Sequence, residues 1–142
     1  MNIAFFLTPK SEVAFLYDDF TVRQGLEKMR HHGYTAIPVI SRNGQYVDAI
    51  REGDFLWYLT GDEAKSSPLH RIGRKNIEKK PLSAVKRHRT YEPVNITASV
   101  EQLMDKACTQ NFVPVVDDLG SFIGIITRRD IIKYFYSHDR IE

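Results

Sequence analysis

The sequence predicts an α/β fold of the α+β type, in which two pseudo-symmetric β-α-β-β-α units pack as one module. Two observations lead to this prediction. Apolar residues recur in the same order in the two halves of the chain, which indicates an internal repeat. Each half also alternates short extended segments with stretches that have helical apolar spacing. A chain of 142 residues has the length of about one compact domain, so we expect the repeats to share one body.

The first helix of each repeat is predicted from four positions at i, i+3, i+4 and i+7. These positions are Val22, Gly25, Leu26 and Met29 in the first repeat and Val100, Leu103, Met104 and Ala107 in the second. The spacing places each set on one helix face. Thr21-x-x-Gln24 and Ser99-x-x-Gln102 come directly before and predict a capping box at each helix N-terminus.

A short extended segment precedes each of these helices, and a β-hairpin follows. We expect the extended segments at Val13–Tyr17 and Pro93–Ile96, and the hairpin strands at Ala36–Ile40, Tyr46–Ile50, Phe112–Val116 and Phe122–Ile126. The polar loops between paired strands contain Gly44 and Gly120, which is typical of hairpins. Pro38 and Pro114 fall within the first hairpin strands. Because proline cannot donate to a sheet, we expect each at a strand edge or start.

A second helix completes each repeat. The pattern predicts these helices near Asp54–Leu59 and Asp130–Tyr136, and short helices at Ile3–Leu7 and Leu82–Lys86. The stretch between the repeats contains Pro68 and Gly73 and lacks periodicity, which is typical of a linker. The predicted organisation is therefore a first domain at residues 1–60, a linker at 61–77 and a second domain at 78–142.

Composition excludes several classes of protein. Twenty Lys and Arg against 18 Asp and Glu give a net charge of +2, which is too small to indicate nucleic-acid binding. A basic run between Arg71 and Arg89 has no recognition motif beside it, so we interpret it as a solvated face. Cys108 is the single cysteine, and no apolar stretch approaches the roughly 20 residues of a membrane span. We expect a cytoplasmic protein with no metal site and no membrane association.

The repeat resembles a tandem pair of cystathionine-β-synthase (CBS) domains, called a Bateman module. The resemblance rests on Ala36-Ile37-Pro38-Val39 with Asp54, and on Val113-Pro114-Val115-Val116 with Gly124-Ile125-Ile126-Thr127-Arg128-Arg129-Asp130. The last stretch is similar to the family signature Gly-h-h-Thr-x-x-Asp, where h is apolar. Leu7-Thr8-Pro9 resembles the Met-Thr-Pro that often opens the first domain. Residues 33–39, with 10–14 upstream and Thr127-Arg128-Arg129 downstream, are similar to small stand-alone CBS proteins of Gram-positive bacteria that bind cyclic di-AMP.

The resemblance implies a non-catalytic module that binds an adenosine ligand and regulates a partner protein. The family's ligands are AMP, ADP, ATP, S-adenosylmethionine, NAD and cyclic di-AMP, and cyclic di-AMP is the preferred expectation here. No cofactor is required, no catalytic set of nucleophile and base is visible, and the regulated protein is unknown. Paired modules of the family commonly form dimers through their second helices, so we expect a homodimer. The alternative is a dimeric interaction scaffold whose clefts hold no ligand.

The spacing from Thr127 to Asp130 has a chemical rationale in a nucleotide. Thr127 is expected at a helix N-terminus, where unpaired N–H groups and the helix dipole favour a phosphate. Asp130, one turn later, can accept hydrogen bonds from both hydroxyls of a ribose. Arg128 or Arg129 can add charge-assisted contacts. Thr-x-x-Asp is equally a capping box that needs no ligand, so the motif alone leaves both interpretations open.

The first repeat departs from this pattern, because Asp48 replaces the glycine and Arg51 replaces the threonine. Arg51 has no acceptor atom and cannot form a capping box with Asp54. In one interpretation Arg51 contacts a phosphate while Asp54 keeps the ribose. In the other the nucleotide is lost, and Arg51 pairs with Asp54 or Glu52 on the surface.

The resemblance also implies an apolar slot for adenine near the strands that contain Pro-Val. The candidate slot residues are Ala14, Tyr34, Thr35, Ala36, Ile37, Val94, Phe112 and Val113. Tyr34 and Phe112 could stack on a base. The alternative for each of these residues is ordinary core packing, because apolar strand residues are usually buried.

Overall fold

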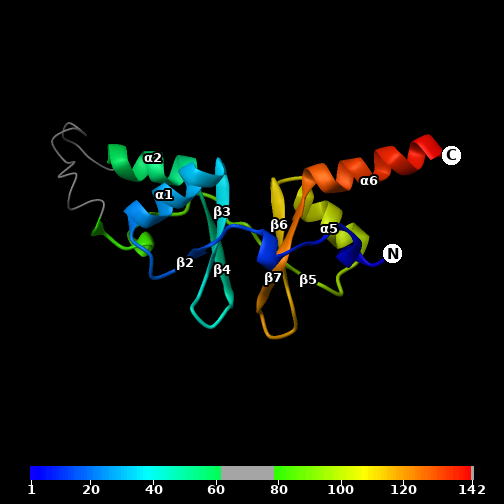
Figure 1. Ribbon diagram of the computed structural model, residues 1–142, viewed down its shortest axis with the longest axis horizontal. Helices are drawn as coiled ribbons and strands as arrows, with labels where there is room; N and C mark the ends of the chain where they lie inside the picture. Colours follow the sequence, from blue (N-terminus) through cyan, green and yellow to red (C-terminus); the bar gives the residue numbers. More distant parts are fainter. Residues whose placement is uncertain (62–78, 142) are drawn as a thin grey trace. The chain divides into compact units, whose positions relative to one another are not determined.

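The computed structural model describes residues 1–61 and 79–141, with side chains as far as Ser137 in the last helix. It confirms the predicted α/β class with two β-α-β-β-α repeats, whose elements can be followed by colour in Figure 1. Apart from Gly61, the predicted linker at 61–77 lies outside the described residues. None of the helices in the described ranges has the length and apolar character needed to cross a bilayer.

The chain folds into two compact units. The first-repeat unit comprises Ala14–Asn43 and Val47–Thr90, and the second-repeat unit comprises Met1–Val13, Gly44–Tyr46 and Tyr91–Glu142. Each unit therefore contains a segment from the other half of the sequence. This division follows packing, whereas the predicted boundaries at 1–60, 61–77 and 78–142 follow the repeat and stay a prediction.

The first-repeat unit has a three-stranded sheet with two helices on one face (Figure 1). The sheet order is β2 (Leu16–Tyr17), β3 (Ala36–Ile40) and β4 (Tyr46–Arg51), with β2 parallel to β3. The helices are α1 (Val22–His32) and α2 (Glu52–Thr60), and the 3₁₀ helix η3 (Leu82–Ala84) completes the unit. Helix α1 ends at Gly33, whose φ of 68° is one that glycine adopts without steric cost.

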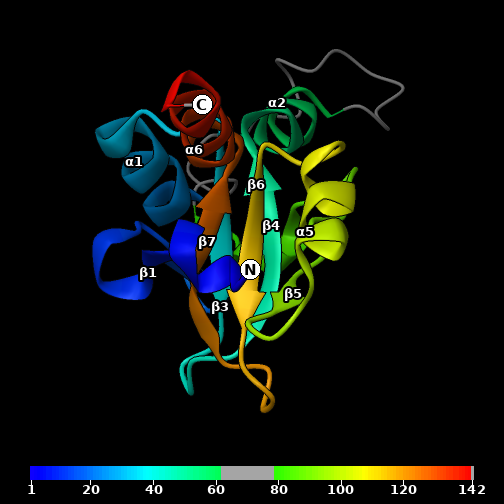
Figure 2. The ribbon, with the colours of Figure 1, turned by 90° about the vertical axis from the view of Figure 1, so that its right-hand side faces the viewer.

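The second-repeat unit repeats this arrangement and adds an N-terminal strand. Figure 2 shows the sheet order, which is β1 (Thr8–Pro9), β7 (Phe122–Thr127), β6 (Phe112–Val116) and β5 (Val94–Asn95). The helices are α5 (Val100–Ala107) and α6 (Arg128–Ile141). The 3₁₀ helices η1 (Ile3–Phe6) and η2 (Lys10–Glu12) flank β1.

Both predicted capping boxes are confirmed. The Thr21 hydroxyl accepts a hydrogen bond from the Gln24 N–H at 3.2 Å, and the Gln24 side chain accepts the Thr21 N–H at 2.8 Å. Ser99 and Gln102 make the same reciprocal pair at 3.1 and 2.9 Å. Each box satisfies two N–H groups that the first turn of a helix otherwise leaves unpaired.

The expectation that Pro38 and Pro114 lie at a strand edge or start is wrong, since both lie in the middle of inner strands. The reason is the shortness of the neighbouring strands. Strand β5 pairs with β6 only from Val115 onward, and β2 pairs with β3 only from Val39 onward. Each proline therefore lies just before the point where the neighbouring strand begins to pair, so no ladder hydrogen bond is required from it.

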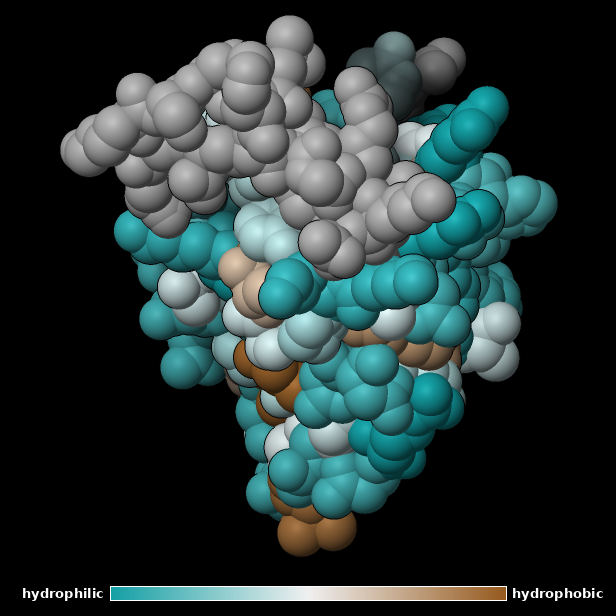
Figure 3. Space-filling model, turned by 90° about the vertical axis from the view of Figure 1, so that its left-hand side faces the viewer, coloured by the Kyte–Doolittle hydropathy of each residue, from teal (hydrophilic) through white to brown (hydrophobic). Residues whose placement is uncertain are grey.

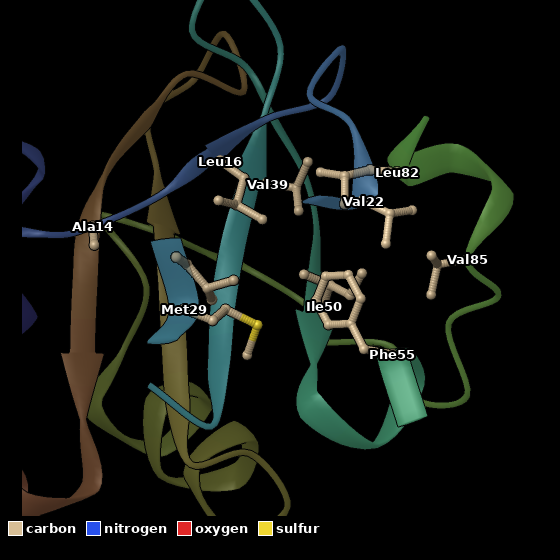
Figure 4. Packing of buried hydrophobic residues seen from close by; sticks show 10 residues of the cluster. Ala14, Leu16, Val22, Met29, Val39, Ile50, Phe55, Leu82 and Val85 are labelled. Atoms are coloured by element: carbon tan, nitrogen blue, oxygen red, sulfur yellow. The ribbon is translucent and has the colours of Figure 1, made fainter. Parts of the chain in front are cut away.

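Each unit has its own hydrophobic core. The first-repeat core contains Ala14, Leu16, Val22, Met29, Ile37, Val39, Ile50, Phe55, Leu82 and Val85, most of them labelled in Figure 4. The second-repeat core contains Ile3, Phe6, Val94, Leu103, Val113, Val115, Ile126 and Ile131. In the face drawn in Figure 3, hydrophilic groups predominate and the hydrophobic groups are small and separate, as expected when apolar side chains fill the interior.

Candidate functional site

Thr127 ends strand β7, and helix α6 begins at the next residue. Its hydroxyl oxygen accepts the Asp130 N–H at 3.1 Å, so Thr127 acts as the N-cap of α6. The Arg128 N–H donates to the Asn111 carbonyl at 3.2 Å. The first turn is therefore partly capped by the protein itself, and the Thr127 O–H remains able to donate.

The Asp130 carboxylate faces the N-terminal segment of the chain. Within the described residues it accepts one side-chain hydrogen bond, from the Thr8 hydroxyl to Oδ2 at 3.5 Å. That distance is at the long limit for a hydrogen bond. A carboxylate offers about four lone-pair positions, so Asp130 keeps most of its accepting capacity.

A hollow of about 480 Å³ lies beside Asp130, between the N-terminal segment and α6. It is lined by Phe5, Phe6, Leu7, Thr8, Asp130, Lys133, Tyr134 and Ser137. The Phe6 and Tyr134 rings meet edge to face with centroids 5.1 Å apart. The hollow thus combines an aromatic wall with hydroxyl groups, a carboxylate and an ammonium group, which is the combination typical of small-molecule sites.

Gly124 explains why Thr8 reaches Asp130. Strands β1 and β7 are antiparallel, with Pro9 opposite Gly124 and Thr8 opposite Ile125. A Cβ at Gly124 would lie 2.2 Å from the Thr8 carbonyl oxygen. The absence of a side chain therefore permits the close approach of β1, and this approach brings the Thr8 hydroxyl to the carboxylate.

The two arginines of the motif have different environments. The Arg128 guanidinium donates to the Ala107 carbonyl at 2.7 Å, the Cys108 carbonyl at 3.1 Å and the Asn111 side chain at 3.0 Å. These bonds hold the C-terminal end of α5, where carbonyl groups lack partners within the helix. Arg129 is exposed, and its guanidinium makes no hydrogen bond or ion pair with the described residues.

In the first repeat, the matching Asp54 is only 1% exposed. Its Oδ2 accepts the Arg51 N–H at 2.9 Å, which is one half of a capping box. Its Oδ1 accepts the His88 N–H at 3.0 Å and lies 3.1 Å from His88 Nδ1. The alternative in which the Arg51 side chain pairs with Asp54 or Glu52 is not seen among the described residues, where His88 contacts Asp54 Oδ1.

Asp48, which stands where the second repeat has Gly124, forms an ion pair with Arg87. Arg87 Nε lies 3.1 Å from Asp48 Oδ2, although its N–H is not aligned for a hydrogen bond. Among the described residues, Asp48 Oδ1 is buried without a partner. Burial raises the pKa of Asp48, and the nearby Arg87 charge partly opposes that rise.

The predicted slot residues divide into buried and accessible groups. Ile37 and Val113 are fully buried in the two cores, while Ala14, Ala36, Val94 and Phe112 are 6–9% exposed. Phe112 packs against Tyr91 with ring centroids 5.0 Å apart. Tyr34 and Thr35 line a separate hollow of about 410 Å³ in the first-repeat unit. Contact of any of these residues with a base stays a prediction.

Sequence reasoning missed Thr8, Lys133 and His88 as site residues. Thr8 stood in the Leu7-Thr8-Pro9 triplet, and its distance from Asp130 along the chain concealed the contact. His88 follows η3 much as Thr8 follows η1, so the matching order of short helix and aspartate partner was the available signal.

The chain is similar to several known proteins. A family model described as the CBS domain matches residues 6–61 and 88–137. An uncharacterised protein of Methanopyrus kandleri is 27% identical over 106 residues, covering 75% of this chain and 49% of the relative. An uncharacterised protein of Methanocaldococcus jannaschii is 24% identical over 141 residues, covering 89% and 47%. The chain spans about half the length of these curated relatives.

Solved structures of similar proteins cover nearly the whole chain. CbpB in complex with c-di-AMP has 25% identity and a TM-score of 0.81, covering 99% of this chain and 89% of that chain. CbpB from Streptococcus agalactiae has 26% identity and a TM-score of 0.76, covering 93% and 78%. A CBS domain protein from Streptococcus pneumoniae TIGR4 has 25% identity and a TM-score of 0.79, covering 94% and 85%. With both repeats matched by one family model, the chain belongs to the CBS-domain family.

Proposed function

We propose that this chain is a non-catalytic regulatory module that binds an adenine nucleotide through the second-repeat motif. One observation carries the proposal: the Asp130 carboxylate, one turn after the N-cap Thr127, opens on a hollow large enough for part of a nucleotide. CBS-domain proteins are generally regulatory modules rather than enzymes, which supports the non-catalytic role.

The phosphate is assigned to the start of α6. This helix has 14 residues, so its N-terminus has a favourable dipole for an anion. The Thr127 O–H can donate to a phosphate oxygen, and the exposed Arg129 side chain can add a charge-assisted contact. Arg128 is assigned a structural role, since its guanidinium already holds the end of α5.

The ribose is assigned to Asp130. A 2′,3′-diol presents two O–H donors side by side, and one carboxylate can accept both. The single long bond from Thr8 is easily exchanged for ribose hydroxyls. A diol one helical turn from an anion site is a combination that a nucleotide satisfies and that a simple sugar or a free phosphate does not.

Cyclic di-AMP is the ligand that we place first. The similar CbpB structure was solved in complex with c-di-AMP, at 25% identity and across 99% of this chain. AMP, ADP, ATP, S-adenosylmethionine and NAD share the adenosine group and are the competing ligands. Binding regulates a partner only if the ligand prefers one of two conformations.

The first test is a thermal-shift and calorimetric titration with those six ligands. A ligand that binds only the native state stabilises it by about 2.7 kcal/mol at 100 times its dissociation constant. We expect cyclic di-AMP to raise Tm most. Asp130→Asn should weaken binding about 10- to 100-fold, because hydrogen bonds to a charged group contribute about 1.5–3 kcal/mol.

Asp18→Asn is the matched control, because Asp18 is an exposed aspartate that lines neither of the hollows described above. It should bind the ligand as wild type does. A folded wild-type protein that binds none of the six ligands would contradict the proposal. Equal affinity in wild type and Asp130→Asn would show that the ligand does not bind at Asp130.

The second candidate is a ligand-free interaction scaffold that acts as a homodimer. Two observations favour it: Asp54 is buried against its own chain, and α2 and α6 expose large apolar side chains. Trp57 is 51% exposed and Tyr136 60% exposed. Analytical ultracentrifugation of wild type and Trp57→Glu tests the dimer, and addition of cyclic di-AMP separates the candidates. A dimer whose partner binding ignores nucleotide would favour the scaffold.

A further inference from the structure

The two motif aspartates have opposite environments, although they occupy the same place in their repeats. Asp130 is partly exposed and lines the hollow beside α6. Asp54 is 1% exposed, and both of its oxygen atoms are already bonded within the first-repeat unit. A ribose diol needs a carboxylate with two accessible lone pairs and space in front of it. The contacts of Asp54 use about three of its four lone-pair positions, and its burial leaves no space in front of the carboxylate.

His88 is the residue that covers Asp54. Its backbone N–H donates to Oδ1 at 3.0 Å, and its ring Nδ1 lies 3.1 Å from the same oxygen. Two nitrogen atoms at hydrogen-bond distance from one carboxylate oxygen occupy the positions that two ribose hydroxyls would need. In the second repeat, Thr8 makes only one contact with the carboxylate, at 3.5 Å.

A second set of contacts holds His88 in place. The neighbouring Arg87 donates to the Leu82 carbonyl at 3.0 Å, and its Nε lies 3.1 Å from Asp48 Oδ2. Leu82 and Val85, on the same segment, are at most 2% exposed and belong to the first-repeat core. The segment is thus anchored by apolar burial and by an ion pair. Displacing His88 from Asp54 therefore works against packing as well as against two polar contacts.

The departure of the first motif from the signature explains this difference. In the second repeat, Gly124 lets β1 pair backbone to backbone with β7, so the aspartate partner arrives on a strand. In the first repeat, Asp48 has a side chain at the matching position, and this side chain meets Arg87. The partner segment is held there by side-chain contacts, which bring His88 directly over the carboxylate.

We infer that His88 determines the stoichiometry of the module by closing the ribose position at Asp54, so that one ligand binds per chain, at Asp130. This inference rests on the proposed function and adds to it a residue that excludes ligand from the first motif. Arg51 remains near the closed position with no described partner for its guanidinium. The Arg51 guanidinium can therefore contact a phosphate at this position once His88 is replaced.

Equilibrium dialysis with radiolabelled AMP and cyclic di-AMP tests the inference by counting bound molecules per chain at saturation. We expect one in wild type and two in His88→Ala. Because the backbone N–H at position 88 survives this substitution, Arg87→Ala/His88→Ala is measured as well, to release the segment from Asp48. His31→Ala is the matched control, since His31 is an exposed histidine on α1. Its count should remain one.

The outcomes separate this inference from the proposed function. Two molecules bound per chain in wild type would overturn the closure at Asp54. A count of one in both the single and the double variant, with Tm showing a folded protein, would overturn the role of His88. No binding of either probe by wild type would contradict the proposed function itself. In the double variant Asp130→Asn/His88→Ala, we expect the molecule at Asp130 to be lost and the one at Asp54 to be retained. That result would support both the proposed function and the role of His88.

Discussion

Replacing Gly124 by alanine should separate strand β1 from the second-repeat sheet. The new Cβ would lie 2.2 Å from the Thr8 carbonyl oxygen, 2.8 Å from Leu7 Cδ1 and 3.1 Å from Pro9 Cα. Carbon and oxygen atoms in contact are usually about 3.3–3.6 Å apart. The backbone of β1 must therefore move by roughly 1 Å, and no side-chain rotation can relieve a clash with a carbonyl oxygen.

The expected cost can be worked from two contributions. Inserting a methyl group into a filled space costs about 1–3 kcal/mol. The φ of 156° at Gly124 is one that other residues rarely adopt, which adds roughly 1 kcal/mol. A total of about 2–4 kcal/mol corresponds to a fall in Tm of about 6–12 °C for a chain of this size. Nucleotide affinity should fall as well, because Leu7 and Thr8, which line the hollow beside Asp130, would be displaced.

Differential scanning calorimetry measures the loss of stability, and hydrogen exchange locates it. We expect faster exchange near Thr8 than elsewhere in the sheet. Gly53→Ala is the control, because its Cβ would meet only Arg51 Nη2, at 3.8 Å. Alanine within a helix should stabilise by up to about 1 kcal/mol relative to glycine. A Gly124→Ala protein within about 0.5 kcal/mol of wild type would refute the close-approach argument.

Three further predictions concern other parts of the chain. Arg128→Ala should lower the free energy of unfolding, measured by urea titration, by about 2 kcal/mol, because its hydrogen bonds to the end of α5 are lost. Arg129→Ala should leave the free energy of unfolding unchanged and weaken nucleotide binding. The opposite result would mean that Arg129 is the structural residue and Arg128 the ligand-binding one. Phe55→Ala removes a ring that is 2% exposed and should cost about 3–5 kcal/mol by the same method, a loss below 1 kcal/mol being incompatible with its core position. Burial raises the pKa of Asp48, so folding favours its protonated form. The free energy of unfolding of wild type, minus that of Asp48→Asn, should therefore fall as pH rises from 4 to 7. A rise of this difference with pH would contradict the raised pKa.

The parts of the fold that depend on nearby residues were predictable from the sequence. The capping boxes at Thr21 and Ser99 use residues three positions apart, and the hairpins use loops of adjacent residues. Both were confirmed. The placement of Pro38 and Pro114 depends instead on how far a neighbouring strand extends. That length is set by tertiary packing, and for this reason the expectation of edge positions failed.

The candidate site shows the same division. The cap of α6 by Thr127 lies within one helical turn and could be predicted as an alternative to ligand binding. The contact between Asp54 and His88 joins residues 34 positions apart, and that between Thr8 and Asp130 joins residues 122 apart. No local pattern encodes such contacts. The two arginines also look alike in sequence, and only the position of the end of α5 distinguishes them.

The exchange of segments between the units has a consequence for synthesis and folding. Ile3 and Phe6 belong to the second-repeat core, so during synthesis these two residues must wait for Ile126 and Ile131 before they are buried. Leu82 and Val85 complete the first-repeat core. A gene cut after Gly61 would give one product without Leu82 and another without Ile3. Each product should be poorly stable alone, and mixing the two should restore both cores.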